Sequence, residues 1–258
     1  MILVDKCDGV ALIRLNRPEA MNALTDELVD QLVSIIETAS VDPAVRCLVI
    51  TGEGRAFCAG GDVKTMSTDT TASFNEKLER LRRKHRLPKL LRECPKVSIA
   101  MVNGPAIGAG FGLALCCDFR IIATDAYFGA TFARLGMSTD FGVAWLLPRL
   151  AGTSLATRWL LRGERIDASA ALQAGLVNQV AESGSLQQDA LLFAREFSDG
   201  PALAYRMIKR NLLAAEQMSF GESLEMEAIN QVAAVESNDH KEAVQAFVEK
   251  RSAVFQGN

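Results

Sequence analysis

Asp140 is the carboxylate that we single out as a candidate catalytic group. It lies in the segment GMSTDFGVAWLLPR, residues 136–149, among small and apolar residues. A carboxylate in such a segment can take up and release a proton during a reaction. The segment also leads into a predicted helix over residues 141–150, and Ser138, Thr139 or Asp140 could cap that helix. Both interpretations are open from this segment alone.

Two glycine-rich loops each follow a predicted strand. The first, RAFCAGGD, covers residues 55–62, and the second contains Gly108, Gly110 and Gly112. The second departs from the dinucleotide-binding pattern G-x-G-x-x-G, because its third glycine comes one residue early. Two such turns can direct backbone N–H groups at one oxygen atom. Tight packing of small residues explains the second loop equally well, and Asp62 is expected to cap a helix.

Charge and cysteine usage exclude several classes of function. The chain has 258 residues, a net charge of -3 and no long run of Lys or Arg, so we expect no nucleic-acid partner. Two histidines and six cysteines without C-x-x-C spacing provide no zinc site, so no metal is expected. Reduced cysteines and the lack of a signal-peptide pattern are typical of a cytoplasmic protein.

One uncharged stretch, residues 97–117, is long enough to span a membrane. Asn103, Gly104 and Pro105 interrupt it, and three further glycines follow them. These residues predict a strand, a turn and a buried helix. We therefore expect no membrane span and no membrane association.

Alternating strands and helices must position these residues. Compact apolar runs at residues 10–16 and 46–52 predict buried strands, with a helix between them. A charged helix that begins at Phe74, with a break near Pro88, precedes the next strand. The pattern recurs along the chain, but residues 185–250 predict only helices.

This order of elements predicts an α/β fold with a helical appendage. We assign residues 1–195 to the core and residues 196–258 to a helical C-terminal region, with no Pro- or Ser-rich linker between them. The C-terminal helices carry apolar residues that a small lobe cannot bury alone. We therefore expect them to pack against another subunit.

Five segments of the chain carry the signature of a family. They are RPEAMNALT (17–25), RAFCAGGDVKTM (55–66), VNGPAIGAGFGLALCCDFRII (102–122), AGLVNQV (174–180) and AFVEKR (246–251). In this order they resemble the enoyl-CoA hydratase/isomerase, or crotonase, superfamily. The resemblance implies a spiral of ββα units with C-terminal trimerisation helices, assembled as a homotrimer or a dimer of trimers. It also implies an acyl-CoA substrate that lies across the two loops, with no cofactor beyond the coenzyme A moiety.

The resemblance also assigns roles by position. The backbone N–H groups of Gly61 and Ala109 would be the donors of the oxyanion hole. Ala59 would lie beside the adenine ring of coenzyme A, while Phe247 and Lys250 would hold the coenzyme A of a neighbouring subunit. The other residues predicted to bind coenzyme A or substrate are Ala23, Asp62, Val63 and Phe132.

The acid and base positions decide which reaction a family member performs. Hydratases use two glutamates, and this chain has Gly112 and Phe132 at the matching positions, so two-glutamate hydration is not expected. The segment around Asp140 resembles that of Asp-dependent enoyl-CoA isomerases of the phenylacetate type, although Val143 replaces a glycine of their pattern. We therefore expect an enoyl-CoA isomerase in which Asp140 moves a proton between carbons while the thioester oxygen holds enolate charge.

The expected base needs a particular environment. A free aspartate binds protons too weakly at neutral pH, so an apolar surround must favour its protonated form. Phe132, Phe141 and Trp145 are the neighbours that we expect to provide this surround.

Two alternatives are open. Asp140 also matches the nucleophile of 4-chlorobenzoyl-CoA dehalogenase, and His85 stands at the same separation from it as the histidine of that enzyme. This match favours dehalogenase-like or thioester-hydrolytic chemistry, although a solvated place on a charged helix explains His85 equally well. The alternative from another class is a non-catalytic acyl-CoA-binding or scaffold protein.

Overall fold

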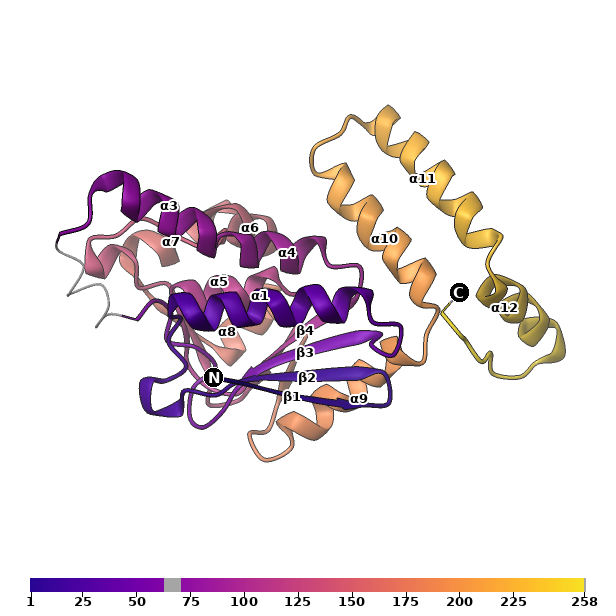
Figure 1. The fold of residues 1–258 in the computed structure, drawn as a ribbon, viewed down its shortest axis with the longest axis horizontal. Coiled ribbons are helices and arrows are strands. Elements are labelled where there is room, and N and C mark those ends of the chain that lie inside the picture. The colour runs from indigo at the N-terminus through magenta and orange to yellow at the C-terminus, as the bar shows by residue number, and fades with distance from the viewer. Residues whose placement is uncertain (63–70, 258) are drawn as a thin grey trace.

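The computed structural model describes residues 1–62 and 71–257, and within them the chain forms two sheets (Figure 1). The larger sheet has the strand order β1-β2-β3-β4-β6-β9, and the smaller has the order β5-β7-β8. β1 is antiparallel to β2, whereas the other pairs of the larger sheet are parallel. The strands are β1 (Ile2–Cys7), β2 (Val10–Leu15), β3 (Cys47–Gly52), β4 (Val97–Val102), β5 (Ala106–Ile107), β6 (Phe119–Ala123), β7 (Tyr127–Gly129), β8 (Arg165–Asp167) and β9 (Gln179–Ala181).

Helices alternate with these strands and then continue alone to the end of the chain. The described helices are α1 (Asp26–Val41), α3 (Phe74–Lys84), α4 (Arg86–Glu93), α5 (Ala109–Cys116), α6 (Val143–Ala151), α7 (Thr153–Arg162), α8 (Ala168–Gln173), α9 (Leu186–Ser198), α10 (Ala202–Ala215), α11 (Phe220–Val235) and α12 (Asn238–Glu249). This order confirms the predicted α/β core followed by an all-helical region.

The central strands β3 and β4 are buried along their whole length. Their sequences, CLVITG and VSIAMV, are nearly continuous apolar runs, as expected for parallel strands covered on both faces. α9 packs against β3 and β4, while α1, α4 and α5 form the layer on the other side of the sheet (Figure 1). The loops that follow the carboxyl ends of β3 and β4 are therefore held at one edge of a rigid sheet.

The charged helix that begins at Phe74 breaks at His85, three residues before Pro88, where the break was predicted. α3 begins at a capping box formed by Ser73 and Glu76 and ends at Lys84. Pro88 has no N–H to donate to the carbonyl of Lys84, so the helix cannot continue through that turn. Pro88 itself lies in the first turn of α4. The consequence is that His85 occupies the junction between α3 and α4.

The uncharged stretch at residues 97–117 folds as predicted, as a strand, a turn and a helix. Every residue of β4 and α5 is buried, and the two elements belong to the core. Among the residues that the structure describes, no helix is long and apolar enough to cross a membrane.

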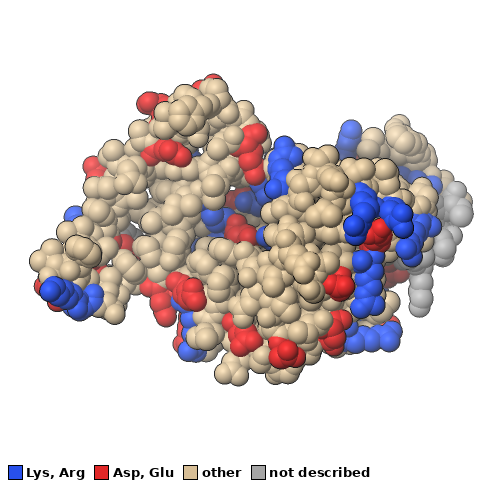
Figure 2. Space-filling view, turned by 180° about the vertical axis from the view of Figure 1, so that it is seen from behind, with Lys and Arg blue, Asp and Glu red and all other residues tan. Residues whose placement is uncertain are grey.

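The C-terminal helices α10, α11 and α12 extend away from the sheet (Figure 1). Seen from behind, much of this part of the surface is uncharged, with acidic and basic groups near its edges (Figure 2). Its exposed apolar side chains include Ile208, Leu212, Phe220, Leu224, Ile229, Val232, Phe247 and Val248. Apolar surface of this kind is typical of an interface. The trimer and the division into two domains at residue 195 stay predictions.

Close backbone packing between the two glycine-rich loops gives a prediction for stability. A Cβ atom at Gly110 would lie 2.2 Å from the carbonyl oxygen of Cys58, a distance that requires backbone movement. We expect Gly110→Ala to lower the free energy of unfolding by about 3 kcal/mol. Gly221→Ala in α11 is the matched control, because a Cβ there meets nothing within 4 Å and should leave stability equal or higher. Chemical denaturation at one protein concentration compares the two, and an undiminished stability of Gly110→Ala would contradict the packing.

Candidate active site

The two glycine-rich loops meet backbone against backbone. Cys58 and Ala106 form an isolated parallel bridge, in which the N–H of Ile107 donates to the carbonyl of Cys58 at 2.9 Å. The N–H of Cys58 donates in turn to the carbonyl of Pro105 at 3.1 Å. A Cβ at Gly60, where φ is +90°, would lie 2.6 Å from the carbonyl oxygen of Ile107. Only glycine fits at this position, and the close approach joins the first loop to the start of α5.

The N–H groups of Gly61 and Ala109 lie at this junction. The N–H of Leu24 donates to the carbonyl of Gly60 at 2.7 Å, which fixes the strand-like backbone beside Gly61. Ala109 is the first residue of α5, whose N-cap Gly108 provides no side-chain hydrogen bond. The backbone nitrogen of Ala109 lies 3.3 Å from the position that a Cβ of Gly60 would occupy. The arrangement can present two amides to one oxygen atom, with the positive end of the α5 dipole behind them.

His85 and Asp140 are in direct contact, although 55 positions separate them in the sequence. His85 Nε2 and Asp140 Oδ1 are 2.5 Å apart, and the two side chains are 44% and 26% exposed. The junction of α3 and α4 supplies the histidine, and the loop before α6 supplies the aspartate. His85 is therefore partly exposed, as a position on the helix surface predicts, and it also contacts the candidate base.

Asp140 is not the side-chain cap of α6. The N-cap of this helix is Gly142, which makes no side-chain hydrogen bond, and the Asp140 carboxylate instead accepts the N–H of Phe141 at 2.7 Å. The backbone carbonyl of Asp140, not its carboxylate, accepts the N–H of Val143. The carboxylate is thus available for chemistry beside His85.

The loop that carries Asp140 packs onto α5 near Ala109. A Cβ at Gly112, one turn into α5, would lie 2.5 Å from Cβ of Phe141, so no larger residue fits there without movement. The ring of Phe132 lies over the start of the same helix, 3.8 Å from the Cβ position of Gly108. α5 therefore carries the amide of Ala109 at its start and, one turn further along, packs against Phe141, the neighbour of Asp140. The contact also explains why position 112 does not accommodate a glutamate in this backbone.

The expected apolar surround of Asp140 is only partly present. Phe132 and Phe141 are buried, but Trp145 is 36% exposed. Its ring faces the guanidinium groups of Arg92 and Arg149, at 4.9 and 3.8 Å from the ring centroid. Phe132 and Phe141 are therefore the buried members of the expected surround. The polar neighbour that the structure provides is His85.

Three further predicted residues lie around Arg17. The guanidinium donates to the carbonyl of Ala23 at 2.7 Å and contacts the carboxylate of Asp62 at 3.2 Å. The N–H of Ala59 donates to the carbonyl of Met21 in the same turn. The sequence singled out the segment that contains Arg17 but not this side chain, because its partners lie in a different loop. Val63 and the helix that Asp62 was expected to cap lie outside the described residues.

Phe247 and Lys250 are not brought to the loops within one chain. Both belong to the end of α12, which lies far from α3 and the loop side of the core (Figure 1). The Phe247 side chain is 84% exposed. Arg251 fixes this end of the helix by pairing with Glu242 and Glu249, and the hydrogen bond from Arg251 lowers the pKa of Glu242 to about 2.

The thiol inside the first loop is not a nucleophile at neutral pH. Burial raises the pKa of Cys58 to about 12, and it does the same for Cys116 at the end of α5. Within residues 1–62 and 71–257, no group of three His, Cys, Asp or Glu side chains could hold a metal ion. The chemistry of this site therefore falls to the backbone amides, Asp140 and His85.

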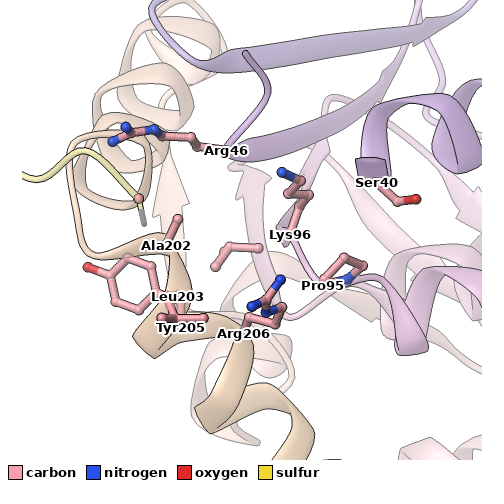
Figure 3. Close-up of a pocket in the computed structure, with 10 residues that line it drawn as sticks. Ser40, Arg46, Pro95, Lys96, Ala202, Leu203, Tyr205 and Arg206 are labelled. Atoms are coloured by element: carbon pink, nitrogen blue, oxygen red, sulfur yellow. The ribbon is translucent and has the colours of Figure 1, made fainter. Parts of the chain in front are cut away.

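A separate pocket lies at the opposite edge of the sheet, before β3 and β4 begin (Figure 3). It has a volume of about 90 Å³, and Arg46, Lys96 and Arg206 are among its lining residues. Burial lowers the pKa of Lys96, with the charges of the two arginines adding to the effect. No predicted site residue lines this pocket, so it is distinct from the candidate active site.

The fold and the site define a class of protein, and comparison with known sequences agrees. Residues 5–258 match the family model described as enoyl-CoA hydratase/isomerase. The chain is 37% identical over 250 residues to 1,2-epoxyphenylacetyl-CoA isomerase of Escherichia coli K12, covering 96% of this chain and 95% of the relative. It is 36% identical to mitochondrial enoyl-CoA hydratase of Pongo abelii, covering 97% and 84% of the two chains.

Solved structures give the same result. The crystal structure of an enoyl-CoA hydratase from Polaromonas sp. JS666 superposes with a TM-score of 0.95 at 32% identity, covering 98% of this chain and 99% of that one. The chain therefore belongs to the enoyl-CoA hydratase/isomerase family, and its fold is crotonase-like. Because the relatives include isomerases and hydratases, the reaction must be argued from the site.

Proposed function

We propose that this protein is an enoyl-CoA isomerase that uses Asp140 as its base. The observation that carries the proposal is the packing of the loop with Asp140 against α5, a helix that begins at Ala109 and has no space for a glutamate at position 112. Hydration needs groups that hold and activate water, whereas one carboxylate can both remove and return a proton. The isomerase among the relatives supports the same choice.

The reaction follows from the two parts of the site. The thioester oxygen of a 3-enoyl-CoA accepts hydrogen bonds from the N–H groups of Gly61 and Ala109. Asp140 takes a proton from the α carbon, and the electron pair moves into a dienolate whose negative charge lies on that oxygen. The protonated Asp140 then returns the proton to the γ carbon. The double bond has moved to the 2-position, and the carboxylate is regenerated without a further reactant.

Coenzyme A binding rests on the first loop and on a second subunit. Ala23, Ala59 and Asp62 surround Arg17 beside the amide of Gly61, where the thioester would lie. Phe247 and Lys250 lie too far from this loop within one chain, so we assign them to the coenzyme A of a neighbouring subunit. A homotrimer or a dimer of trimers in the cytoplasm, with no other cofactor, completes the proposal.

The test is NMR of a panel of enoyl-CoA esters with the purified protein in deuterated buffer. An isomerase moves the double bond, and on prolonged incubation with many turnovers it introduces deuterium at the α and γ carbons. Binding of the esters with neither change would support a non-catalytic acyl-CoA-binding protein. Addition of water across the double bond would contradict the proposed reaction and favour hydration.

The contact between His85 and Asp140 favours a second candidate function. In a dehalogenase-like or hydrolytic enzyme, Asp140 attacks as a nucleophile and His85 activates the water that cleaves the resulting ester. Such an enzyme would accumulate a covalent Asp140 adduct when His85 is replaced by Gln, because release of the product would fail. Mass spectrometry of the intact His85→Gln protein after mixing with substrate distinguishes this function from the isomerase, which forms no adduct.

A further inference from the structure

The two oxygens of the Asp140 carboxylate have different surroundings. Oδ1 contacts His85 Nε2 at 2.5 Å and accepts the N–H of Phe141 at 2.7 Å. Within residues 1–62 and 71–257, no group hydrogen-bonds to Oδ2. The carboxylate is therefore held by one oxygen, while the other is unengaged.

The backbone fixes one of these two contacts. Phe141 has φ of +51°, a left-handed conformation that costs a residue with a side chain about 1–2 kcal/mol. Its ring is buried and its Cβ packs against Gly112, so the surrounding core maintains this conformation. The buried Phe141 thereby holds its backbone N–H in place as a donor to the carboxylate of the preceding residue.

The break between α3 and α4 fixes the other contact. Pro88 interrupts the helix, so His85 is the residue at the junction of α3 and α4, and from there its imidazole contacts Asp140. The ring also lies edge-on to Phe141, with 6.1 Å between the ring centroids. Its outer side lines a cavity of about 370 Å³ between α4, α6 and α10. The histidine thus stands between the carboxylate and a space that solvent can occupy.

We propose that His85 is a positioning residue, whose Nε2–H holds Oδ1 of Asp140 so that Oδ2 is the oxygen that carries the migrating proton. The inference deepens the proposed isomerase function and rests on it. With Oδ1 held by two donors, the carboxyl group cannot rotate, and the proton on Oδ2 stays beside the substrate. The proton is then returned to the acyl chain before it exchanges with water.

The role predicts a change in the fate of the proton as well as in the rate. Without the imidazole, the carboxyl group rotates toward the cavity, and its proton exchanges with solvent before it is returned. For His85→Ala we expect kcat to fall roughly tenfold with KM little changed, since misplacement of a reacting group lowers the rate of the chemical step. The fraction of first-turnover product that carries deuterium should rise at the same time. His85→Gln keeps an N–H donor and should restore both quantities toward the wild-type values.

The experiment measures deuterium per turnover by NMR at early times for wild type, His85→Ala and His85→Gln. His240→Ala, at the exposed start of α12, is the matched control and should behave as wild type. Unchanged kcat and unchanged deuterium fraction in His85→Ala would overturn the proposal. A lower kcat with an unchanged deuterium fraction would also overturn it, because loss of folded protein alone gives that result. Wild-type protein that moves no double bond would instead contradict the isomerase function itself.

Discussion

Asp140→Asn is expected to lower the rate of double-bond migration by roughly 10²–10⁴-fold, the usual contribution of a general acid or base. The asparagine has the same shape, and its side-chain oxygen can still accept the N–H of Phe141, so the loop before α6 should keep its conformation. What is lost is the carboxylate that takes up and returns the migrating proton. The measurement is the initial rate of isomerisation by NMR or absorbance, with the product identified in each case.

Binding must survive this substitution if Asp140 acts on the proton alone. The coenzyme A contacts proposed for Ala59 and Asp62 belong to another loop, so the dissociation constant for a CoA thioester should change by no more than roughly twofold. Asp199→Asn, an exposed carboxylate at the end of α9, is the control and should leave the rate unchanged. An Asp140→Asn protein that isomerises at the wild-type rate would remove this residue from the mechanism.

Local sequence signals predicted the elements that bear the site. The apolar runs of β3 and β4 identify buried strands because both faces of a parallel sheet are covered. Thr25 marks the start of α1, and its side chain accepts the N–H of Leu28 as a cap. Tight packing of small residues was one of the two explanations for the three glycines at the start of α5, and the contact of Gly110 with the Cys58 carbonyl is packing of this kind. Each of these features depends on residues close together in the sequence.

Contacts between distant segments were not predictable in the same way. The residue types of His85 and Asp140 made them candidates, but their contact depends on the packing of the α3–α4 junction against the loop before α6. The helix break lies at His85 and not at Pro88, and helical periodicity does not locate it. The stacking of Trp145 between Arg92 and Arg149 similarly requires three separate positions to meet. Without a fold, apolar character alone placed this tryptophan beside the carboxylate.

The resemblance to the family supplied what local signals could not. It paired Gly61 with Ala109 although their loops follow different strands, and the backbone contacts between Cys58, Ala106 and Ile107 bring those loops together. Packing then explains why the loops are rich in glycine, since a Cβ at Gly60 would collide with the carbonyl of Ile107.

Removal of one amide from the oxyanion hole should slow the reaction nearly as much as removal of the base. Ala109→Pro eliminates the N–H at the first position of α5, where proline is tolerated because that N–H makes no bond within the helix. Gly108 precedes it and has no Cβ to clash with the proline ring. A single donor to a developing oxyanion contributes about 3 kcal/mol, so we expect kcat to fall by roughly 10²–10³-fold.

Ala109→Gly distinguishes the effect of the lost N–H from the effect of the lost methyl group, since it removes the side chain and keeps the N–H. Its kcat should stay within roughly threefold of wild type, whereas that of Ala109→Pro should not. Circular dichroism and the dissociation constant for free coenzyme A show whether both proteins are folded and retain the first loop. If folded Ala109→Pro retained the wild-type kcat, the thioester oxygen would not be bound at the start of α5, and the enolate would need other donors.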